Sequence, residues 1–234
     1  MARSSRQRLS PLHRLLRGIV RGLLVALAGY FGLCTLALLL YNVVDPPTTG
    51  VQLQRRVASW FSEQPYEKHY RPVPLERIAD VLEHAVIAAE DGRFFEHHGI
   101  DWQAVREAVE DNRRRGRTWR GGSTITQQLV KNLFMTTHSS YLRKALEVPL
   151  AYLAELLLSK ERILELYLNV IEWGDGIYGA EAAARHYYGI GAGRLSRHQA
   201  AALAAVIPNP RHRHPDRMGW YRDVILRRMQ QMGY

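Results

Sequence analysis

The sequence predicts an all-α protein in which a single N-terminal transmembrane helix is followed by an α-helical domain. Residues 22–44 contain no charged side chain, and from residue 76 onward apolar residues recur at the three- and four-residue spacings of a helix. No run of four or more residues alternates like a half-buried strand. The chain has 234 residues, 47% of them hydrophobic, with only 10 prolines and 18 glycines. This composition suits one globular domain plus an appendage and excludes a disordered or fibrous protein.

The first predicted elements are a basic tail, residues 1–21, and a transmembrane helix, residues 22–44. The tail holds six arginines and no acidic residue, which is more than half of the net charge of +10. A helix over residues 22–44 would be about 34 Å long, enough to cross a hydrocarbon core of about 30 Å. The positive-inside rule then keeps the N-terminus in the cytoplasm. The alternative is a cleaved signal peptide, whose apolar region is usually only about 7–15 residues long.

The single cysteine, Cys34, lies inside the predicted span. One cysteine excludes an intramolecular disulfide framework and zinc or iron–sulfur sites built from cysteines. The exported part of the chain would contain no cysteine at all, which suits an oxidising periplasm.

Residues 45–75 are predicted to form a linker and a membrane-proximal surface helix that carries Val57, Trp60 and Phe61. Residues 76–234 form the predicted helical domain, whose helices are marked by capping and terminating residues. These are Asp101, Ser123, Ser140, the S-x-x-Q capping box of Ser196 and Gln199, and Pro208. We expect Ser123 to cap a helix that starts at Thr124.

The first candidate site is the sequence EDGRFFEHHG, residues 90–99, which follows a helix that is apolar on one side. A carboxylate there has apolar neighbours, which raise its pKa, and cationic or hydrogen-bonding neighbours, which lower it. General bases are tuned by this opposition. Glu90 is therefore a candidate base, and the alternative is a solvated Glu-Asp pair at the end of a helix.

The second candidate site is GGSTITQQLVKN, residues 121–132. On a helix, Thr124, Gln128 and Lys131 fall on one face, and the start of the helix offers free N–H groups to an anion. A hydroxyl, an amide and an ammonium group suit a sugar phosphate. The alternative is an ordinary amphipathic helix with a polar outer face.

Arg143 and Glu147 are four residues apart on the next predicted helix. They could form a surface salt bridge of little energetic value, or a cation and a carboxylate that line the same cleft.

Together these segments resemble the peptidoglycan glycosyltransferase family, which is found alone or as the first catalytic domain of bifunctional penicillin-binding proteins. The motif E-D-x-x-F-x-x-H-x-G matches residues 90–99, G-x-S-T-I-T-Q-Q-x-x-K-N matches 121–132, R-K-x-x-E matches 143–147, and K-x-x-I-L-E-x-Y-L-N matches 160–169. Residues 173–189 and 195–210 resemble the last two blocks. Only about 24 residues follow the last block. We therefore expect a monofunctional biosynthetic member without a transpeptidase domain.

The resemblance implies a lysozyme-like helical fold and the polymerisation of lipid II into glycan strands for the cell wall. The O4 hydroxyl of the acceptor lipid II attacks the growing chain with inversion, forming a β-1,4 bond and expelling undecaprenyl diphosphate. Glu90 matches the family's base, and Glu147 matches a second carboxylate that orients substrate or coordinates a cation. Lys131 and Arg143 match diphosphate-binding positions. The full set of implied substrate-binding residues is Asp91, Phe94, His97, Ser123, Thr124, Gln127, Gln128, Lys131, Asn132 and Arg143.

The resemblance also implies a single-pass protein of the inner (cytoplasmic) membrane with a periplasmic catalytic domain. Its expected partners are lipid II, the growing glycan chain and membrane lipid, with cell-division proteins as a further candidate class. The sequence requires no cofactor and assigns no metal ligands, although a divalent cation, Mg or Mn, has a place at the diphosphate. The five arginines of residues 113–120 have no nucleic-acid motif around them, so no nucleic acid is expected.

Two functions of other classes stay open at this point. A lytic muramidase would use Glu90 as a general acid on finished glycan, and the cations at Lys131 and Arg143 argue against it because glycan has no diphosphate. A non-catalytic, membrane-anchored division scaffold would not need both carboxylates.

Overall fold

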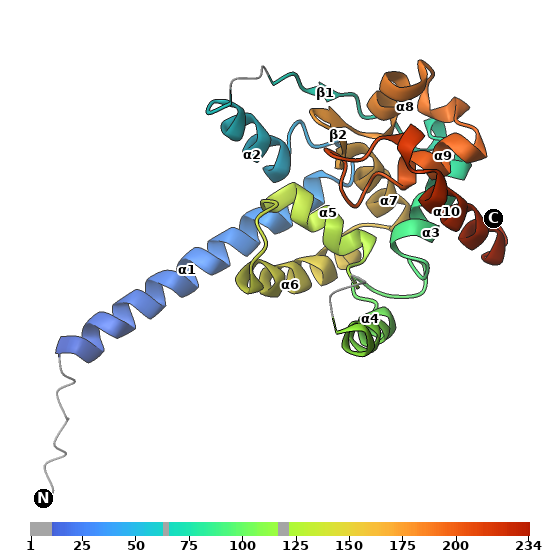
Figure 1. Ribbon diagram of the computed structural model, residues 1–234. Coiled ribbons are helices and arrows are strands. Elements are labelled where there is room, and N and C mark those ends of the chain that lie inside the picture. Colours follow the sequence, from blue (N-terminus) through green and yellow to red (C-terminus); the bar gives the residue numbers. More distant parts are fainter. Residues whose placement is uncertain (1–10, 63–65, 117–121) are drawn as a thin grey trace, which may run out of the picture.

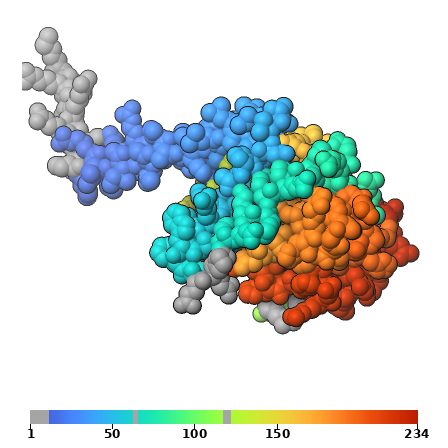
Figure 2. Space-filling model, turned by 90° about the horizontal axis from the view of Figure 1, so that it is seen from above, coloured from blue at the N-terminus to red at the C-terminus, as the bar shows by residue number. Residues whose placement is uncertain are grey.

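The computed structural model describes residues 11–62, 66–116 and 122–234. The N-terminal helix α1 (Pro11–Leu40) projects from one side of the molecule, and the C-terminal third of the chain gathers on the opposite side (Figures 1 and 2). Within α1, residues Leu12–Leu40 are long and apolar enough to cross a membrane. The helix thus begins well before residue 22 and ends before residue 44. The arginines of residues 14–21 continue it because arginine favours helix, whereas residues 1–10 lie outside the described part of the chain.

The C-terminal half of α1 packs against the globular part. Cys34 and Leu38 are buried there. The hydroxyl of Tyr30 donates a hydrogen bond to the carbonyl oxygen of Phe134 over 3.4 Å, and Nδ2 of Asn42 donates to a carbonyl at the end of α6 over 2.7 Å. The span and the globular part are therefore joined by direct contacts.

Helices make up most of the regular structure of the globular part, which confirms the predicted all-α class. In chain order they are α2 (Gly50–Ser59), α3 (Asp80–Glu90), α4 (Trp102–Arg115), α5 (Ile125–Phe134), α6 (Tyr141–Leu157), α7 (Lys160–Val170), α8 (Ala180–Tyr188), α9 (Arg197–Ala204) and α10 (Gly219–Gln231), with short 3-10 helices η1 (Leu75–Arg77), η2 (Ala192–Arg194) and η3 (Pro215–Arg217). Helix α3 packs against α9 and α10, and α5 packs against α2, α6 and α7.

A small three-stranded sheet was not predicted. Strand β3 (Ile177–Tyr178) lies between β1 (His69–Tyr70), to which it is parallel, and β2 (Glu172–Gly174), to which it is antiparallel. These strands are two or three residues long, too short for an alternating pattern to show in the sequence. They fasten the segment after α2 to the body of the protein.

The capping predictions are mostly confirmed. Asp101 accepts a hydrogen bond from the N–H of Ala104, Ser140 caps α6, and Ser196 and Gln199 form the predicted capping box of α9. Ser123 was predicted to cap α5, and this is wrong. The N-cap is the next residue, Thr124. Its side chain accepts from the N–H of Gln127, and the side chain of Gln127 accepts from the N–H of Thr124, so the two residues form a reciprocal capping box.

Candidate active site

Glu90 ends α3, and its half-buried carboxylate contacts α5. Nε2 of Gln128 donates a hydrogen bond to Oε2 of Glu90 over 2.8 Å. Burial raises the pKa of Glu90 above its usual range, while the Gln128 hydrogen bond and the positive charges of Lys131 and Arg213 lower it. The opposed influences that the sequence predicted are therefore present around this carboxyl group.

Lys131 lies one turn further along α5 and is also half-buried. Burial lowers the pKa of its ammonium group, and the negative charges of Glu147 and Glu90 raise it. Lys131 thus interacts electrostatically with both candidate carboxylates. The three residues come from three helices, and Lys131 lies within electrostatic range of both carboxylates.

Glu147 is buried and has two cationic partners on its own helix. Arg143 contacts its Oε1, and Nζ of Lys144 lies 2.9 Å from its Oε2. The alternative of a surface salt bridge is wrong, because the side chain of Glu147 is only 3% exposed and that of Arg143 only 18%. The Nε of Arg143 is buried and has no hydrogen-bond partner among the described residues.

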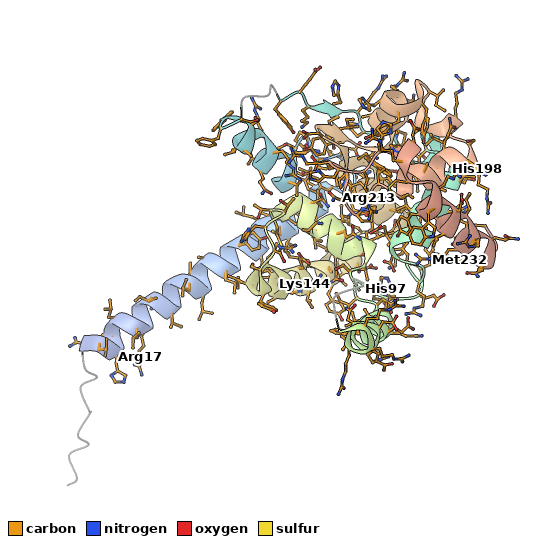
Figure 3. The ribbon with its side chains drawn as sticks, viewed as in Figure 1. Arg17, His97, Lys144, His198, Arg213 and Met232 are labelled. Atoms are coloured by element: carbon orange, nitrogen blue, oxygen red, sulfur yellow. The ribbon has the colours of Figure 1, made fainter. Side chains whose placement is uncertain are left out.

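Figure 3 places Lys144 on α6, His97 in the turn after α3 and Arg213 in the loop before α10.

Four of the implied substrate-binding residues make contacts inside the protein. The hydroxyl of Thr124 donates to the carbonyl oxygen of Gly99 over 2.6 Å and accepts from the N–H of Gln127 over 3.1 Å. Nδ2 of Asn132 donates to the carbonyl of residue 128, and the hydroxyl of Ser123 accepts from Nζ of a lysine on α6. The helical spacing predicted that Thr124 shares one face with Gln128 and Lys131. The structure shows that it does not, because its hydroxyl faces Gly99 and Gln127 instead.

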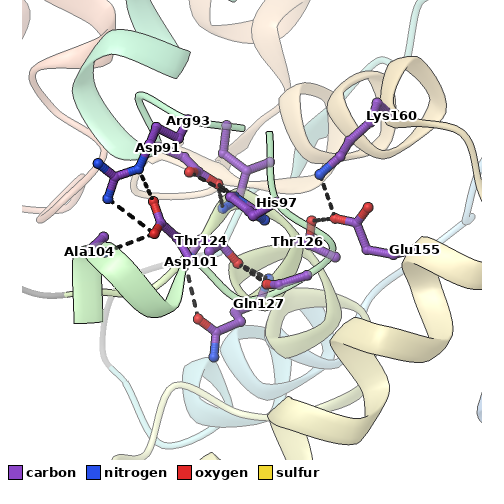
Figure 4. Close-up of polar contacts among 12 residues, drawn as sticks. Asp91, Arg93, His97, Asp101, Ala104, Thr124, Thr126, Gln127, Glu155 and Lys160 are labelled. Carbon is purple, nitrogen blue, oxygen red and sulfur yellow. Dashed lines mark hydrogen bonds and ion pairs between the residues drawn. The ribbon is translucent and has the colours of Figure 1, made fainter. Parts of the chain in front are cut away.

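Asp91 ties the turn of residues 90–99 to the start of α5 (Figure 4). Its two carboxylate oxygens lie 3.0 Å from Nε2 of His97, and Oδ2 accepts the N–H of Ile125 over 2.9 Å. The predicted anion site at this helix start is therefore occupied by a carboxylate of the protein itself. Gly99 has a φ of +90°, and a Cβ there would lie 3.2 Å from the backbone of Ala151, so only glycine fits this motif position.

Two further contacts hold the same turn in place. Phe94 is fully buried, and Nζ of Lys160 lies 4.4 Å from the centre of its ring. Arg93 makes two hydrogen bonds to Asp101, the residue that caps α4 (Figure 4). These contacts fix the conformation of the turn that follows Glu90.

A cavity of about 360 Å³ opens beside Gln128 and Lys131. It lies between α2, α5 and residues 207–212, and its polar lining includes Arg55, Asn132, Glu172, Asn209 and Arg211. Nη2 of Arg55 forms an ion pair with Oε2 of Glu172 over 2.9 Å. Sequence reasoning missed this pair because its partners are 117 positions apart and belong to none of the predicted polar segments.

Sequence reasoning also missed the role of Tyr167. Its hydroxyl donates to Oε1 of Gln128 over 2.9 Å, so it touches the residue that holds Glu90. The tyrosine stands inside the fourth motif, which was the only signal for it. Arg213 lies just beyond the last motif and gave no signal.

The described residues contain no group of three or more His, Cys, Asp or Glu side chains that could hold a metal ion. Both carboxylate oxygens of Glu147 already contact cationic side chains. A divalent cation at Glu147 would have to compete with Arg143 and Lys144, so these residues do not fit a resident metal.

Comparison with known proteins identifies relatives of the chain. Residues 55–230 match the transglycosylase family model. The chain is 50% identical over 198 residues to the biosynthetic peptidoglycan transglycosylase of Bordetella pertussis, covering 81% of this chain and 82% of that protein. It is 54% identical over 189 residues to the protein of that name from Herminiimonas arsenicoxydans (79% and 82% covered), and 45% identical over 230 residues to that from Pseudomonas syringae (95% and 94% covered).

Proposed function

The chain belongs to the transglycosylase family, and from this premise we propose that it polymerises lipid II with Glu90 as the general base. It is a glycosyltransferase of peptidoglycan synthesis. The observation that carries the finer proposal is the link from Glu90 through Lys131 to Glu147. Gln128 bonds to Glu90 and lines the same cavity as Lys131, which supports a proton acceptor and a cation for the leaving group as neighbours.

Glu90 takes the proton from the O4 hydroxyl of the acceptor's N-acetylglucosamine. The oxygen then attacks the anomeric carbon of N-acetylmuramic acid at the end of the growing chain. The bond from that carbon to undecaprenyl diphosphate breaks, the electron pair leaves with the diphosphate, and the new β-1,4 bond has inverted configuration. Because burial raises the pKa of Glu90, its carboxylate is a stronger base than an exposed one.

Lys131 and Arg143 bind the diphosphate as its negative charge develops. The buried Nε of Arg143 has no partner among the described residues, which leaves a donor for a phosphate oxygen. Glu147 holds Arg143 and Lys144 in place. A fixed array of cations around a departing anion is an effective form of transition-state stabilisation. A raised pKa at Glu90 would also suit the general acid of a muramidase, so the cations are what favour glycosyl transfer from a diphosphate.

Helix α1 supports a membrane anchor, and we propose an inner-membrane protein with a cytoplasmic N-terminus and a periplasmic catalytic domain. Tyr30 of α1 contacts Phe134 at the end of α5. The helix between the last arginine of the tail, Arg21, and this contact is only about 12 Å long. A hydrocarbon core is about 30 Å thick. The outer half of α1 therefore also lies in the bilayer, and the exposed Tyr141 and Leu142 at the start of α6 are suited to its outer leaflet.

Lipid II carries its diphosphate at the membrane surface, so this depth brings the cations of α5 and α6 to the leaving group. The exposed Trp60 and Phe61 after α2 provide a second apolar contact. Cell-division proteins stay a proposed class of partner on the resemblance alone.

The test is to incubate the full-length protein in detergent micelles with labelled lipid II and to digest the product with a muramidase. We expect a polymer that the muramidase cuts into disaccharide units. Release of fragments from finished glycan, with no polymer from lipid II, would establish the muramidase alternative instead. A protein inactive in both assays would support the scaffold.

A further inference from the structure

Tyr167 is a fully buried residue of α7 with one polar atom in its side chain. Its hydroxyl donates a hydrogen bond to Oε1 of Gln128 over 2.9 Å. Burial and the negative charges of Glu90 and Asp91 hold its pKa well above the usual range. The hydroxyl therefore keeps its proton, and remains a donor, over the whole pH range in which the enzyme works.

The side-chain amide of Gln128 has a donor end and an acceptor end. In the structure, its Nε2 donates to Glu90 and its Oε1 accepts from Tyr167. A carboxylate accepts hydrogen bonds and cannot donate them. If the amide turned over, its oxygen would face the carboxylate and the tyrosine hydroxyl would lose its acceptor. The donor at Tyr167 thus favours the one amide orientation that serves Glu90.

We infer that Tyr167 is a positioning residue, which fixes the amide of Gln128 so that it donates to the base. This inference rests on the proposed role of Glu90. Tyr167 acts only through Gln128 and does not touch the reacting atoms.

The other charged groups around Glu90 are independent of this contact. Lys131 on α5 and Arg213 in the loop before α10 favour its ionised form, and its neighbour Asp91 opposes it. From α10, Tyr221 interacts electrostatically with Glu90. Arg228, on the same helix, donates to the carbonyl oxygens of residues 88 and 89, just before Glu90. None of these groups bonds to the hydroxyl of Tyr167, so their effect on Glu90 remains when that hydroxyl is removed.

Tyr167→Phe removes the hydroxyl and keeps the ring. Without this donor, Oε1 of Gln128 loses its hydrogen bond from Tyr167, and the amide is held less firmly in the orientation that donates to Glu90. We expect the pKa of Glu90 to rise, and the acid limb of the pH–kcat profile to move up by about one pH unit. At a pH well above the new limb, kcat returns toward the wild-type value.

The test combines kinetics with a direct titration of Glu90. The pH–kcat profile on lipid II is measured for Tyr167→Phe, Gln128→Ala and the double variant, and the Glu90 carboxyl is titrated in each full-length protein by carbon-13 NMR. The NMR signal is assigned by its loss in Glu90→Gln. Tyr187→Phe is the matched control, because its hydroxyl donates to the carbonyl of Trp173 away from Glu90.

We expect Tyr167→Phe to shift the profile, Tyr187→Phe to leave it unchanged, and the double variant to match Gln128→Ala alone. A loss of activity that is equal at every pH, an unchanged NMR titration, or shifts that add in the double variant would each overturn the inference. If Glu90→Gln kept full activity, the base assignment would fail instead, and the NMR titration would still decide whether Tyr167 acts on Glu90.

Discussion

Replacing Glu90 with glutamine removes the proposed base and keeps the size of the side chain. Arg143 and Lys144 keep their contacts with Glu147 in this variant, so these cations of the proposed diphosphate site stay in place. The loss is then confined to proton transfer, and a missing general base costs about 10²–10⁴-fold in kcat. This corresponds to about 3–5 kcal/mol of transition-state stabilisation. We expect KM to change little.

The same substitution should not destabilise the fold. Burial holds the pKa of Glu90 above its value in the unfolded chain. Between these two pKa values the folded state binds more protons, so the free energy of unfolding falls as the pH rises through that interval. Glutamine has no charge to bury and escapes this loss. We expect Glu90→Gln to match the wild type below about pH 4, the unfolded pKa, and to be the more stable protein at pH 7.

Glu83 provides the matched control, because it lies on the same helix and outside the site. Burial, with smaller contributions from Asp80 and Glu76, raises its pKa to about 7. Glu83→Gln should therefore gain stability at neutral pH in the same way and keep full activity. The assays are initial rates with labelled lipid II in micelles and thermal unfolding at pH 4 and pH 7. Turnover by Glu90→Gln within tenfold of wild type, or a lowered Tm at pH 7, would refute the reasoning.

Three further predictions concern the cations, the pH profile and the anchor. Lys131→Ala and Arg143→Ala should each lower kcat on lipid II, and Arg143→Lys should rescue only partly because lysine lacks the guanidinium fork; normal kinetics in both alanine variants would contradict this. The pH–kcat profile should have an acid limb above pH 4.5, from Glu90, and an alkaline limb below pH 10.5, from Lys131; Lys131→Arg should remove the alkaline limb. A chain that lacks residues 1–29 should be active in micelles and clearly slower on lipid II in liposomes, because it loses the effective concentration that tethering supplies; equal rates in liposomes would show that the domain finds its substrate unaided.

The sequence could predict what depends on neighbours along the chain. Helical spacing put Gln128 and Lys131 on one face, and the structure keeps them in the same site. The pattern failed at Thr124, because the residue that caps a helix turns its hydroxyl toward the first N–H groups and here also toward Gly99. A periodic pattern describes the inside of a helix and does not hold at its cap.

Contacts between distant segments were beyond the reach of spacing arguments. Gln128 meets Glu90 across 38 positions and Tyr167 across 39. Asp91 accepts a hydrogen bond from the N–H of Ile125, which is 34 positions away in the sequence. Its carboxylate thereby occupies the predicted anion site. Each of these pairs forms only when α3, α5 and α7 pack together, so tertiary packing decides them and local sequence does not.

The C-terminal half of α1 and the turn after it belong to the fold of the catalytic domain as well as to the apolar stretch that could cross a membrane. Leu38 is fully buried, and Nδ2 of Asn42 satisfies the carbonyl of Leu157 at the end of α6. Removing residues 1–44 would take away both, and burial of one leucine alone stabilises a fold by about 1.5–3 kcal/mol. Removing only residues 1–29 leaves these contacts intact. The shorter truncation should therefore keep the wild-type Tm in micelles while the longer one lowers it, and equal Tm values would show that the domain folds without its span.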